Sequence, residues 1–577
     1  MSTHINLNAA KTSAAITFDY DPNLVTEVKL IPGRKFDGST KTWNVPLESP
    51  ASVAALKRFA DHHGVTLDLD DDNNVLTLPD VSSVEVEGTA AETLRAHQAQ
   101  FVAAVQDGNR ALLLADEPGM GKSASALVGA VAAGASRVLI VSPAVMKRTW
   151  VREISQFVSP DASVAVLSGR KADSAALDGA QFVVINYEIA DAWAETLSAW
   201  APEALIVDEA HYAKNYKAKR TKAVLDLGRS VRSRKGTVFA LTGTPIPNKP
   251  IDLYAVLDLL GVAGAFGSWM DFAKYYCGAY QGPYGIQFGD PRHLDDLHSQ
   301  LTDTVLVRRR KSEVLDLPSR TVADVPVDLD AAGRRSVKAA TSALVTSIQA
   351  AIAVAQQSDD EPVTIDRAYV RRIVAQQLRP GATGDAAGAL ATLRREIGAA
   401  KSALIARQAA DIVEQGEQVV VMVHHREVQD AVGTALIEQG YSVGSITGGQ
   451  DDSARQRDIE RFQAGDLQVI VASIKAAGVG ITLHAASNLV LGELPWTAAD
   501  QDQAIDRIHR IGQDSPVTAW RVLATGTLDD RMADLISKKG SWSREAIDGG
   551  AHERGSREVS QVDVLTDLVC SELGLTP

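Results

Sequence analysis

The sequence predicts an α/β protein with two parallel-sheet lobes, a helical insertion between them and a small α+β module in front. Two observations support this prediction. Short, almost continuously apolar segments alternate with helical patterns twice along the chain, which is typical of parallel sheets covered by helices on both faces. The 577 residues also exceed what a single hydrophobic core supports, since domains usually contain roughly 100–200 residues.

Residues 1–87 are expected to form the small α+β module. Residues 16–87 contain short segments of alternating polarity, which Pro, Gly and Asp interrupt, as in IPGRKFDGSTKTW and LDLDDDNNVLTL. This pattern predicts one or two hairpins, together with a helix near 50–62.

The first lobe is expected at 88–260, where apolar strands alternate with helices. The predicted strands are ALLLA at 111–115, RVLIVS at 137–142, QFVVIN at 181–186, ALIVDE at 204–209 and TVFALTG at 237–243. A helical insertion is predicted at 261–395, because an Ala-rich helical pattern covers 331–410, with polar interruptions at 356–362 and 379–388.

The second lobe is expected at 396–540, where the alternation of strands and helices resumes. Its predicted strands are QVVVMVHH at 418–425, YSVGSITG at 441–448, LQVIVAS at 467–473, NLVLGEL at 488–494 and VTAWRVL at 517–523. The C-terminal tail, 541–577, is polar before a final apolar stretch, and we expect it to be loose up to that stretch.

Composition argues against several classes of protein. No run of about 18 uninterrupted apolar residues is present, so no membrane-spanning helix is expected. The first residues lack the cationic and then apolar pattern of a secretory signal. Cys277 and Cys570 are far apart in the sequence and cannot form a zinc cluster by themselves, and so few cysteines fit a reducing cytoplasmic setting.

The formal net charge of −14 argues against nonspecific binding to nucleic acid. Basic residues are nevertheless concentrated in two places. One is Arg308–Lys311, and the other is a run that contains Lys214, Lys217, Lys219, Arg220, Lys222, Arg229, Arg232, Arg234 and Lys235, with Asp226 as its single acid. From charge alone, a phosphate-binding track and a solvated surface are equally compatible with these clusters.

The segment ALLLADEPGMGKSASALVGA predicts a strand, a glycine turn and a helix that together hold phosphate. Gly119 and Gly121 would let backbone N–H groups approach phosphate oxygens, and the start of the following helix would face the same place. Lys122 would reach the β- and γ-phosphates, and Ser123 would hold Mg²⁺. Asp116 stands where the strict pattern requires glycine, so an ordinary strand-to-helix turn remains the alternative. The expected nucleotide-binding stretch is Asp116, Glu117, Pro118, Gly119, Met120, Gly121, Lys122 and Ser123.

LIVDEAH at 205–211 predicts a magnesium and water site. Two adjacent acidic residues at the end of a buried strand have an unfavourable burial free energy unless their charges bind a partner. Asp208 would take Mg²⁺ through water, and Glu209 would orient and deprotonate the attacking water. The alternative is an acidic helix cap. His211 is expected to couple this site to the loop LTGTP at 241–245 rather than to take part in catalysis.

QAIDRIHRIGQ at 503–513 predicts one helix that carries Gln503, Arg507 and Arg510 on the same face, because they are four and three residues apart. Such arginines could neutralise the charge that develops on a transferred γ-phosphate. A surface pair of arginines is the alternative.

These segments resemble the motifs of the SNF2 family of superfamily 2 helicase-like ATPases over roughly 90–535. TLRAHQ is similar to the Q motif, DEPGMGKS to motif I, VLIVSPAVMKRTW to Ia, DEAH to II, LTGTPIPN to III, VASIKAAGVGITL to V and DRIHRIGQ to VI. The resemblance implies two RecA-like lobes, ATP and Mg²⁺ as cofactors, adenine recognition by Gln98, and nucleotide contacts at Gly480 and Gln503.

Motif V departs from its commonest form at Ile474, Ala477 and Thr482. This variant, together with VHH at 423–425, resembles the fork-remodelling annealing helicases of the family. Residues 18–47 are similar to the HARP domain that precedes the motor in those proteins; the matching residues are Phe18, Tyr20, Pro32, Gly33, Arg34, Phe36 and Trp43. A generic small domain is the alternative for this module.

The resemblance implies a monomeric, DNA-dependent ATPase that moves on double-stranded or forked DNA and remodels or reanneals it. Both basic clusters would then face DNA phosphates. Two alternatives remain. The first is an enzyme with another task, either a strand-separating DNA or RNA helicase or the motor of a restriction-type complex. The second is an ATP-gated DNA clamp that hydrolyses little ATP. Protein partners cannot be inferred from the sequence.

Overall fold

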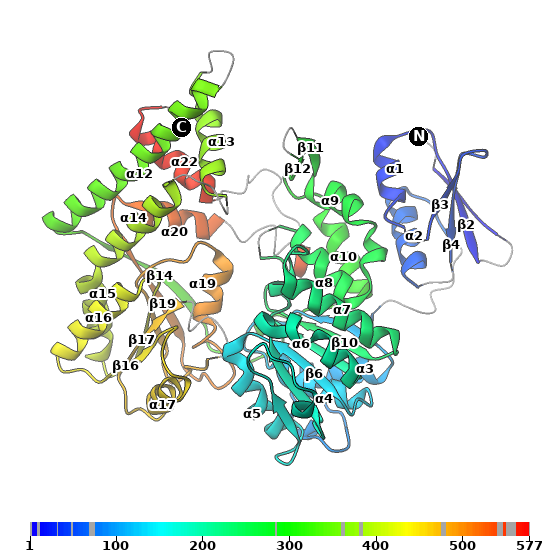
Figure 1. Cartoon of the computed structure of the whole chain (residues 1–577), viewed down its shortest axis with the longest axis horizontal. Helices are drawn as coiled ribbons and strands as arrows, with labels where there is room; N and C mark the ends of the chain where they lie inside the picture. The colour runs from blue at the N-terminus through cyan, green and yellow to red at the C-terminus, as the bar shows by residue number, and fades with distance from the viewer. Residues whose placement is uncertain are drawn as a thin grey trace. The chain divides into compact units, whose positions relative to one another are not determined.

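The computed structural model describes residues 3–8, 12–31, 33–47, 50–67, 76–247, 249–282, 285–358, 364–379, 385–474, 481–538, 546–549 and 561–575. The chain divides into two compact units, whose elements are labelled in Figure 1. The first unit comprises Met1–Val314 and Ser541–Arg554, and the second comprises Leu315–Gly540 and Gly555–Pro577.

The N-terminal module is a four-stranded sheet in the order β1-β2-β4-β3, and all its strand pairs are antiparallel. Ile16, Val28, Val45 and Leu56 form its small core, so α1 and α2 pack on the sheet. This arrangement confirms the predicted α+β character. The elements are β1 (His4–Leu7), β2 (Ser13–Thr17), α1 (Pro22–Val28), β3 (Lys35–Asp37), β4 (Thr42–Pro46) and α2 (Pro50–His62).

The module packs against the lobe that follows it within the first unit. Leu30 is buried in the core of that lobe rather than in the core of the module. Arg34 lies 3.4 Å from Asp271, and Arg58 lies 3.3 Å from Asp303, so two ion pairs flank the apolar contact.

The first lobe contains a seven-stranded sheet, in which every neighbouring pair is parallel, in the order β13-β5-β10-β9-β6-β8-β7. Its five predicted strands are all present. The strands are β5 (Ala111–Leu114), β6 (Val138–Ser142), β7 (Val164–Val166), β8 (Phe182–Asn186), β9 (Ala204–Asp208), β10 (Thr237–Leu241) and β13 (Leu306–Val307). The helices among them are α3 (Ala96–Gln106), α4 (Lys122–Ala132), α5 (Lys147–Phe157), α6 (Tyr187–Trp200), α7 (Lys219–Ser233) and α8 (Ile251–Leu260).

The region 261–395, for which the sequence predicts one helical insertion, is shared between the two units. The first unit contains α9 (Trp269–Cys277), β11 (Tyr280–Gly282), β12 (Gly285–Gln287), α10 (Leu294–Thr304), β13 and α11 (Lys311–Val314). The second contains β14 (Arg320–Val327), α12 (Ala331–Ser358), α13 (Arg367–Gln377) and α14 (Ala386–Ala400). The region is therefore not purely helical, since β13 and β14 each join one of the large sheets.

The second unit is built on a six-stranded sheet in the order β14-β19-β18-β15-β17-β16, again with parallel pairs throughout. Its strands after β14 are β15 (Val419–Val423), β16 (Val443–Ile446), β17 (Val469–Ser473), β18 (Asn488–Leu491) and β19 (Val517–Ala524). Its later helices are α15 (Ser402–Val413), α16 (Arg426–Glu438), α17 (Asp452–Gln463), α19 (Ala498–Ile505), α20 (Leu528–Lys538) and α22 (Gln561–Glu572). Two parallel sheets with helices confirm the predicted fold class.

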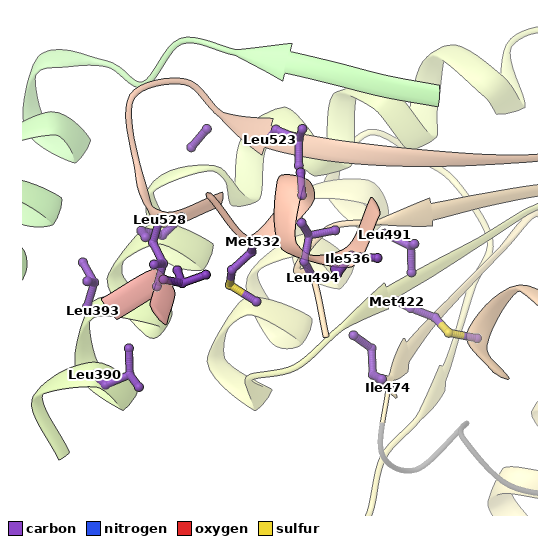
Figure 2. Close-up of a cluster of buried hydrophobic side chains, with 14 of the residues drawn as sticks. Leu390, Leu393, Met422, Ile474, Leu491, Leu494, Leu523, Leu528, Met532 and Ile536 are labelled. Carbon is purple, nitrogen blue, oxygen red and sulfur yellow. The ribbon is translucent and has the colours of Figure 1, made fainter. Parts of the chain in front are cut away.

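The core of the second unit joins its sheet to its helices. Figure 2 shows Leu390 and Leu393 of α14 near Leu528 and Met532 of α20, with Leu491 of β18 in the same buried cluster. In the last part of the chain, α22 packs against α13.

Among the described helices, α12 alone is long and apolar enough, by length and composition, to cross a membrane. A stripe along it, formed by Val337, Leu344, Ile348 and Ile352, is buried in the core of the second unit. The helix packs against α14. Burial of one apolar stripe is the behaviour of a helix that covers a protein core.

Candidate functional site

The loop between β5 and α4 has the backbone that a phosphate cradle needs. Gly119 and Gly121 have φ angles of 85° and 76°, in the left-handed region that favours glycine. Helix α4 begins directly after Gly121, at Lys122. A Cβ atom on Gly121 would lie only 2.2 Å from Nε2 of Gln98, so a larger residue here would displace the Gln98 amide and strain the backbone.

Two side chains of α3 support this loop. The Gln98 amide donates hydrogen bonds to the carbonyl oxygens of Met120 and Gly121, at 3.3 and 3.2 Å. Nε2 of His97 lies 2.9 Å from the Met120 carbonyl oxygen. Burial lowers the pKa of His97, although the hydrogen bond to Met120 opposes this shift. The adenine-recognition role expected for Gln98 stays a prediction; its amide here contacts the phosphate loop.

Lys122 lies inside the curve of the loop. Its ammonium group donates to the carbonyl oxygens of Asp116 and Glu117, at 2.7 and 3.2 Å. Burial lowers the pKa of Lys122, while the charge of Glu209 is the main factor that opposes this shift. Ser123 is half-buried in the first turn of α4.

The carboxylate of Asp116, which stands in place of the expected glycine, is bound by Arg309. The guanidinium donates to both Asp116 oxygens, at 2.9 and 2.5 Å, and both side chains are buried. Arg309 also donates to the carbonyl oxygen of His97. One cation therefore joins the phosphate loop to α3, and this role was not predicted from the sequence.

The expectation that all of Arg308–Lys311 would face DNA phosphates is wrong, because most of this cluster is used inside the first lobe. Arg308 donates to the Ala115 carbonyl and to Asp548, at 2.7 Å each. Lys311 is buried, and its backbone N–H donates to the Glu117 carboxylate at 2.8 Å. Arg310 is exposed and lies 3.6 Å from Glu313.

Asp208 is held at the end of β9 by two donors. The Trp150 indole N–H donates to one carboxylate oxygen at 2.9 Å, and the Glu209 backbone N–H donates to the other at 3.0 Å. The Tyr187 hydroxyl donates to the Asp208 carbonyl at 2.6 Å. Glu209 has a φ angle of 49°, which is uncommon for a residue with a Cβ and marks a backbone held by its surroundings.

Burial raises the pKa of Asp208 to about 7; the neighbouring Glu209 adds to this shift, and the Trp150 hydrogen bond opposes it. Two carboxylates so close together in a buried site favour the approach of a cation. Carboxylate and hydroxyl oxygens are also the ligands that Mg²⁺ prefers, so the donor set of Asp208 and Ser123 fits this ion.

The loop LTGTP contacts both parts of the site. Nδ1 of His211 lies 2.9 Å from the Thr242 hydroxyl and 3.2 Å from the Glu209 carboxylate. A Cβ on Gly243 would lie 2.6 Å from Cγ of Pro118, so this loop packs closely on the phosphate loop. His211 thus lies between Glu209 and the loop, where the sequence analysis placed it.

In the second unit, the prediction of one helix for Gln503, Arg507 and Arg510 is wrong. Helix α19 ends at Ile505, and the chain continues in tighter turns, in which the N–H of Arg507 donates to Ala504 and that of Ile508 to Ile505.

Arg507 and Arg510 nevertheless contact the same neighbouring region. The Arg507 side chain is buried and donates to the Gln503 carbonyl at 3.2 Å, while its own carbonyl accepts from the Leu483 N–H at 2.9 Å. Arg510 donates to the Ile481 carbonyl at 3.4 Å. Both arginines therefore adjoin the segment that follows Gly480, which itself lies outside the described residues.

The basic run after the DEAH sequence is only partly exposed. Arg229 pairs with Asp226 and Asp258, and Lys214 pairs with Asp252. The exposed cations around the start of α7 are Lys217, Lys219, Arg220 and Lys222. These four side chains are the best-placed candidates of the run for a phosphate contact.

Two protein-family models match the chain: the SNF2-related domain over residues 95–374 and the helicase conserved C-terminal domain over residues 402–512. A Xenopus tropicalis protein named SWI/SNF-related matrix-associated actin-dependent regulator of chromatin subfamily A-like protein 1 is 26% identical over 543 residues, which are 90% of this chain and 53% of that protein. The Mus musculus DNA annealing helicase and endonuclease ZRANB3 is 29% identical over 452 residues, which are 76% of this chain and 39% of that protein. The chain thus spans about half, or less, of the length of these relatives.

Two solved structures are also similar. The Sulfolobus solfataricus SWI2/SNF2 ATPase core in complex with dsDNA matches 85% of this chain and 98% of its own, with 21% identity and a TM-score of 0.36. The Pyrococcus furiosus Hef helicase domain matches 75% of this chain and 96% of its own, with 15% identity and a TM-score of 0.45.

Proposed function

Because the chain belongs to the SNF2 family of helicase-like ATPases, we propose that it is a DNA translocase, which hydrolyses ATP on duplex or forked DNA and remodels or reanneals the strands. The ATPase activity itself follows from the two family domains. The observation that most supports the proposal is the phosphate loop around Lys122, which lies beside the Asp208–Glu209 pair.

Each site residue has a distinct proposed role in hydrolysis. Lys122 stabilises the negative charge of the β- and γ-phosphates, and Glu209 orients and deprotonates the attacking water. Asp208 and Ser123 would hold Mg²⁺, which neutralises phosphate charge when it is bound. Arg507 and Arg510 of the second unit stabilise the charge that develops on the transferred phosphoryl group.

The DNA substrate is proposed on two grounds. Lys217, Lys219, Arg220 and Lys222 form an exposed basic group on a chain with a net charge of −14, so a phosphate contact would be local. Several relatives carry the printed name DNA annealing helicase and endonuclease, which supports strand annealing as the outcome of translocation.

The first test measures ATP turnover with single-stranded, duplex and forked DNA and with RNA. We expect stimulation by duplex and forked DNA and none by RNA. Lys122→Ala should abolish turnover, and Glu209→Gln should bind ATP but reduce turnover by about 10²–10⁴-fold, the usual contribution of a general base. Full turnover by either variant would contradict the assigned site.

The second test separates annealing from unwinding. A DNA duplex with a melted internal segment should regain paired strands when ATP and the protein are added, and Glu209→Gln should not produce this change. Release of single strands from a fork, or stimulation by RNA equal to that by DNA, would favour the strand-separating helicase instead. Replacing Lys219, Arg220 and Lys222 with Glu should reduce only the DNA-stimulated rate.

A further inference from the structure

Three metal-ligating side chains meet in the N-terminal module, far along the sequence from the nucleotide site. Nδ1 of His62 lies 2.8 Å from one carboxylate oxygen of Glu27, and Nε2 of His63 lies 2.9 Å from the other. One ligand atom from each of the three residues lies within 4.8 Å of the other two.

The end of α2 makes this convergence possible. Neighbouring residues on a regular helix point in directions about 100° apart, so two adjacent histidines would not normally face one ligand. Here the helix ends in a Schellman motif, with Gly64 at a φ of 65°, its N–H on the Asp61 carbonyl and the Val65 N–H on the Ala60 carbonyl. The two imidazole rings are 23° from parallel, with centroids 5.1 Å apart.

The local electrostatics favour a cation. Glu27 lies in the last turn of α1, and His62 is the last residue of α2, so the C-terminal ends of both helices approach the cluster. Helix C-termini carry partial negative charge, which adds to that of the Glu27 carboxylate.

The cluster is partly preformed and open on one side. The Glu27 and His63 side chains are 13% and 21% exposed, and the His63 ring packs against Phe59 with centroids 4.7 Å apart. The His62 side chain is 57% exposed, which leaves a route for an ion to enter.

We propose that Glu27, His62 and His63 form a binding site for a divalent transition-metal ion, with zinc as the best match. Two imidazole nitrogens and one carboxylate are a common protein ligand set for zinc, in which water completes the coordination. The bound ion would link the end of α1 to the end of α2. These two helices contact α9 and α10 of the first lobe. This effect on the two helices does not depend on the DNA substrate proposed above.

The test uses the full-length chain without nucleotide. Metal-free protein is dialysed against Zn²⁺ and analysed for bound metal, and Co²⁺ absorption reports the ligand geometry. One ion per chain is expected, with at least tenfold weaker binding for Glu27→Gln, His62→Ala and His63→Ala. An Asp208→Asn background removes the contribution of the nucleotide site, and His4→Ala, an exposed histidine of the same module, is the matched control.

Each outcome distinguishes the possibilities. Loss of the ion in the three cluster variants, but not in His4→Ala, supports the site. Equal zinc binding by all variants would mean that the ion binds elsewhere in the chain. Absence of zinc binding by the unmodified chain would mean that the three residues form only a hydrogen-bonded cluster. Either result overturns the proposal. Because the cluster lies outside the nucleotide machinery, the same cluster variants made in the chain that retains Asp208 should keep the basal Mg²⁺-dependent ATPase rate, which verifies that they are folded.

Discussion

At the scale of single residues, Asp116 shows how a departure from a motif can be part of the structure. Its carboxylate is 1% exposed and would be unfavourable there without a counter-charge. Arg309 supplies that charge through two hydrogen bonds. Removal of one partner from a buried pair leaves the other charge unpaired, which typically costs about 3–5 kcal/mol.

The Asp116–Arg309 ion pair predicts that glycine, which the sequence motif requires at position 116, would destabilise this protein. Asp116→Gly restores the strict glycine pattern, yet we expect it to destabilise the first unit by about 3–5 kcal/mol, because the Arg309 guanidinium remains buried without a counter-charge. The double variant Asp116→Gly with Arg309→Met should recover much of this loss. Urea unfolding and nucleotide affinity are the measurements.

Arg310→Met is the matched control, since Arg310 is exposed and should change stability by no more than about 0.5 kcal/mol. If Asp116→Gly were as stable as the unmodified chain, or if the double variant were worse than the single one, the ion pair would not be supporting the loop.

At the scale of elements, Glu493 joins two neighbouring strands of the second sheet. It follows β18 and accepts hydrogen bonds from the backbone N–H groups of His424 and His425, at 2.8 and 2.9 Å, just after β15. Nδ1 of His425 lies 2.6 Å away. Burial alone would raise the pKa of Glu493, but these hydrogen bonds outweigh it and lower the pKa below its usual range.

This shift predicts a specific dependence of stability on pH. A carboxyl whose pKa is lowered in the folded state adds its full contribution to the free energy of unfolding above its unfolded pKa of about 4.3. This contribution declines as the pH falls through the lower folded pKa. Glu493→Gln should therefore be less stable than the unmodified chain near neutral pH, and the difference should shrink below about pH 4.3. Chemical denaturation across this pH range measures it, with the exposed Glu438→Gln as the control.

A difference in stability between the chain and Glu493→Gln that stays constant down to strongly acidic pH would mean that the carboxylate charge is not responsible. An equal change in Glu438→Gln would point to the overall charge of the protein instead.

Elements with strong apolar runs were predictable, and those without them were not. Strands such as β9 and β15 are buried throughout and were predicted from hydrophobicity alone. Strands β7 and β13 contain three and two residues, too few for a pattern. Strand β14 is an edge strand with an exposed or half-exposed face along its length, so its sequence RTVADVPV does not look like a buried strand.

The candidate site was predictable where a local motif encodes it. The residues around Lys122 and Asp208 lie at or just after the ends of their strands, so their position in the sequence was sufficient to predict them as site residues. Arg309 is 193 residues from Asp116, and no local pattern joins them. The one available signal was a basic cluster directly after a short buried strand. The end of α19 was missed because a spacing of three residues fits both an α-helix and tighter turns.

At the scale of the whole chain, the N-terminal module and the first lobe belong to one compact unit. Leu30 is buried in the lobe core, and Arg34 and Arg58 pair with Asp271 and Asp303. The sequence predicts a distinct module at 1–87, and the structure shows that it shares with the lobe an apolar contact that removal of the module would expose.

A chain that starts at residue 88 should therefore fold but be less stable than the full chain, with a lower Tm. It should keep DNA-stimulated ATP turnover, because every proposed nucleotide contact lies beyond residue 90, and lose any preference for forked DNA. Leu30→Ala in the full chain is the companion variant and should lower the Tm by less than the deletion does. Unchanged Tm and unchanged fork preference after the deletion would show that the module contributes neither packing nor substrate choice.

The Asp116–Arg309 pair also has an evolutionary consequence. Each side chain is buried and satisfies the other although the two residues are 193 positions apart, so a change at one position alone is disfavoured in any homologue that keeps this packing. In an alignment of homologues, the residues at the positions of Asp116 and Arg309 should therefore covary. Homologues with an uncharged residue at the first position should also lack the cation at the second. Sequences that lose only one of the two are expected to have acquired another buried charge nearby.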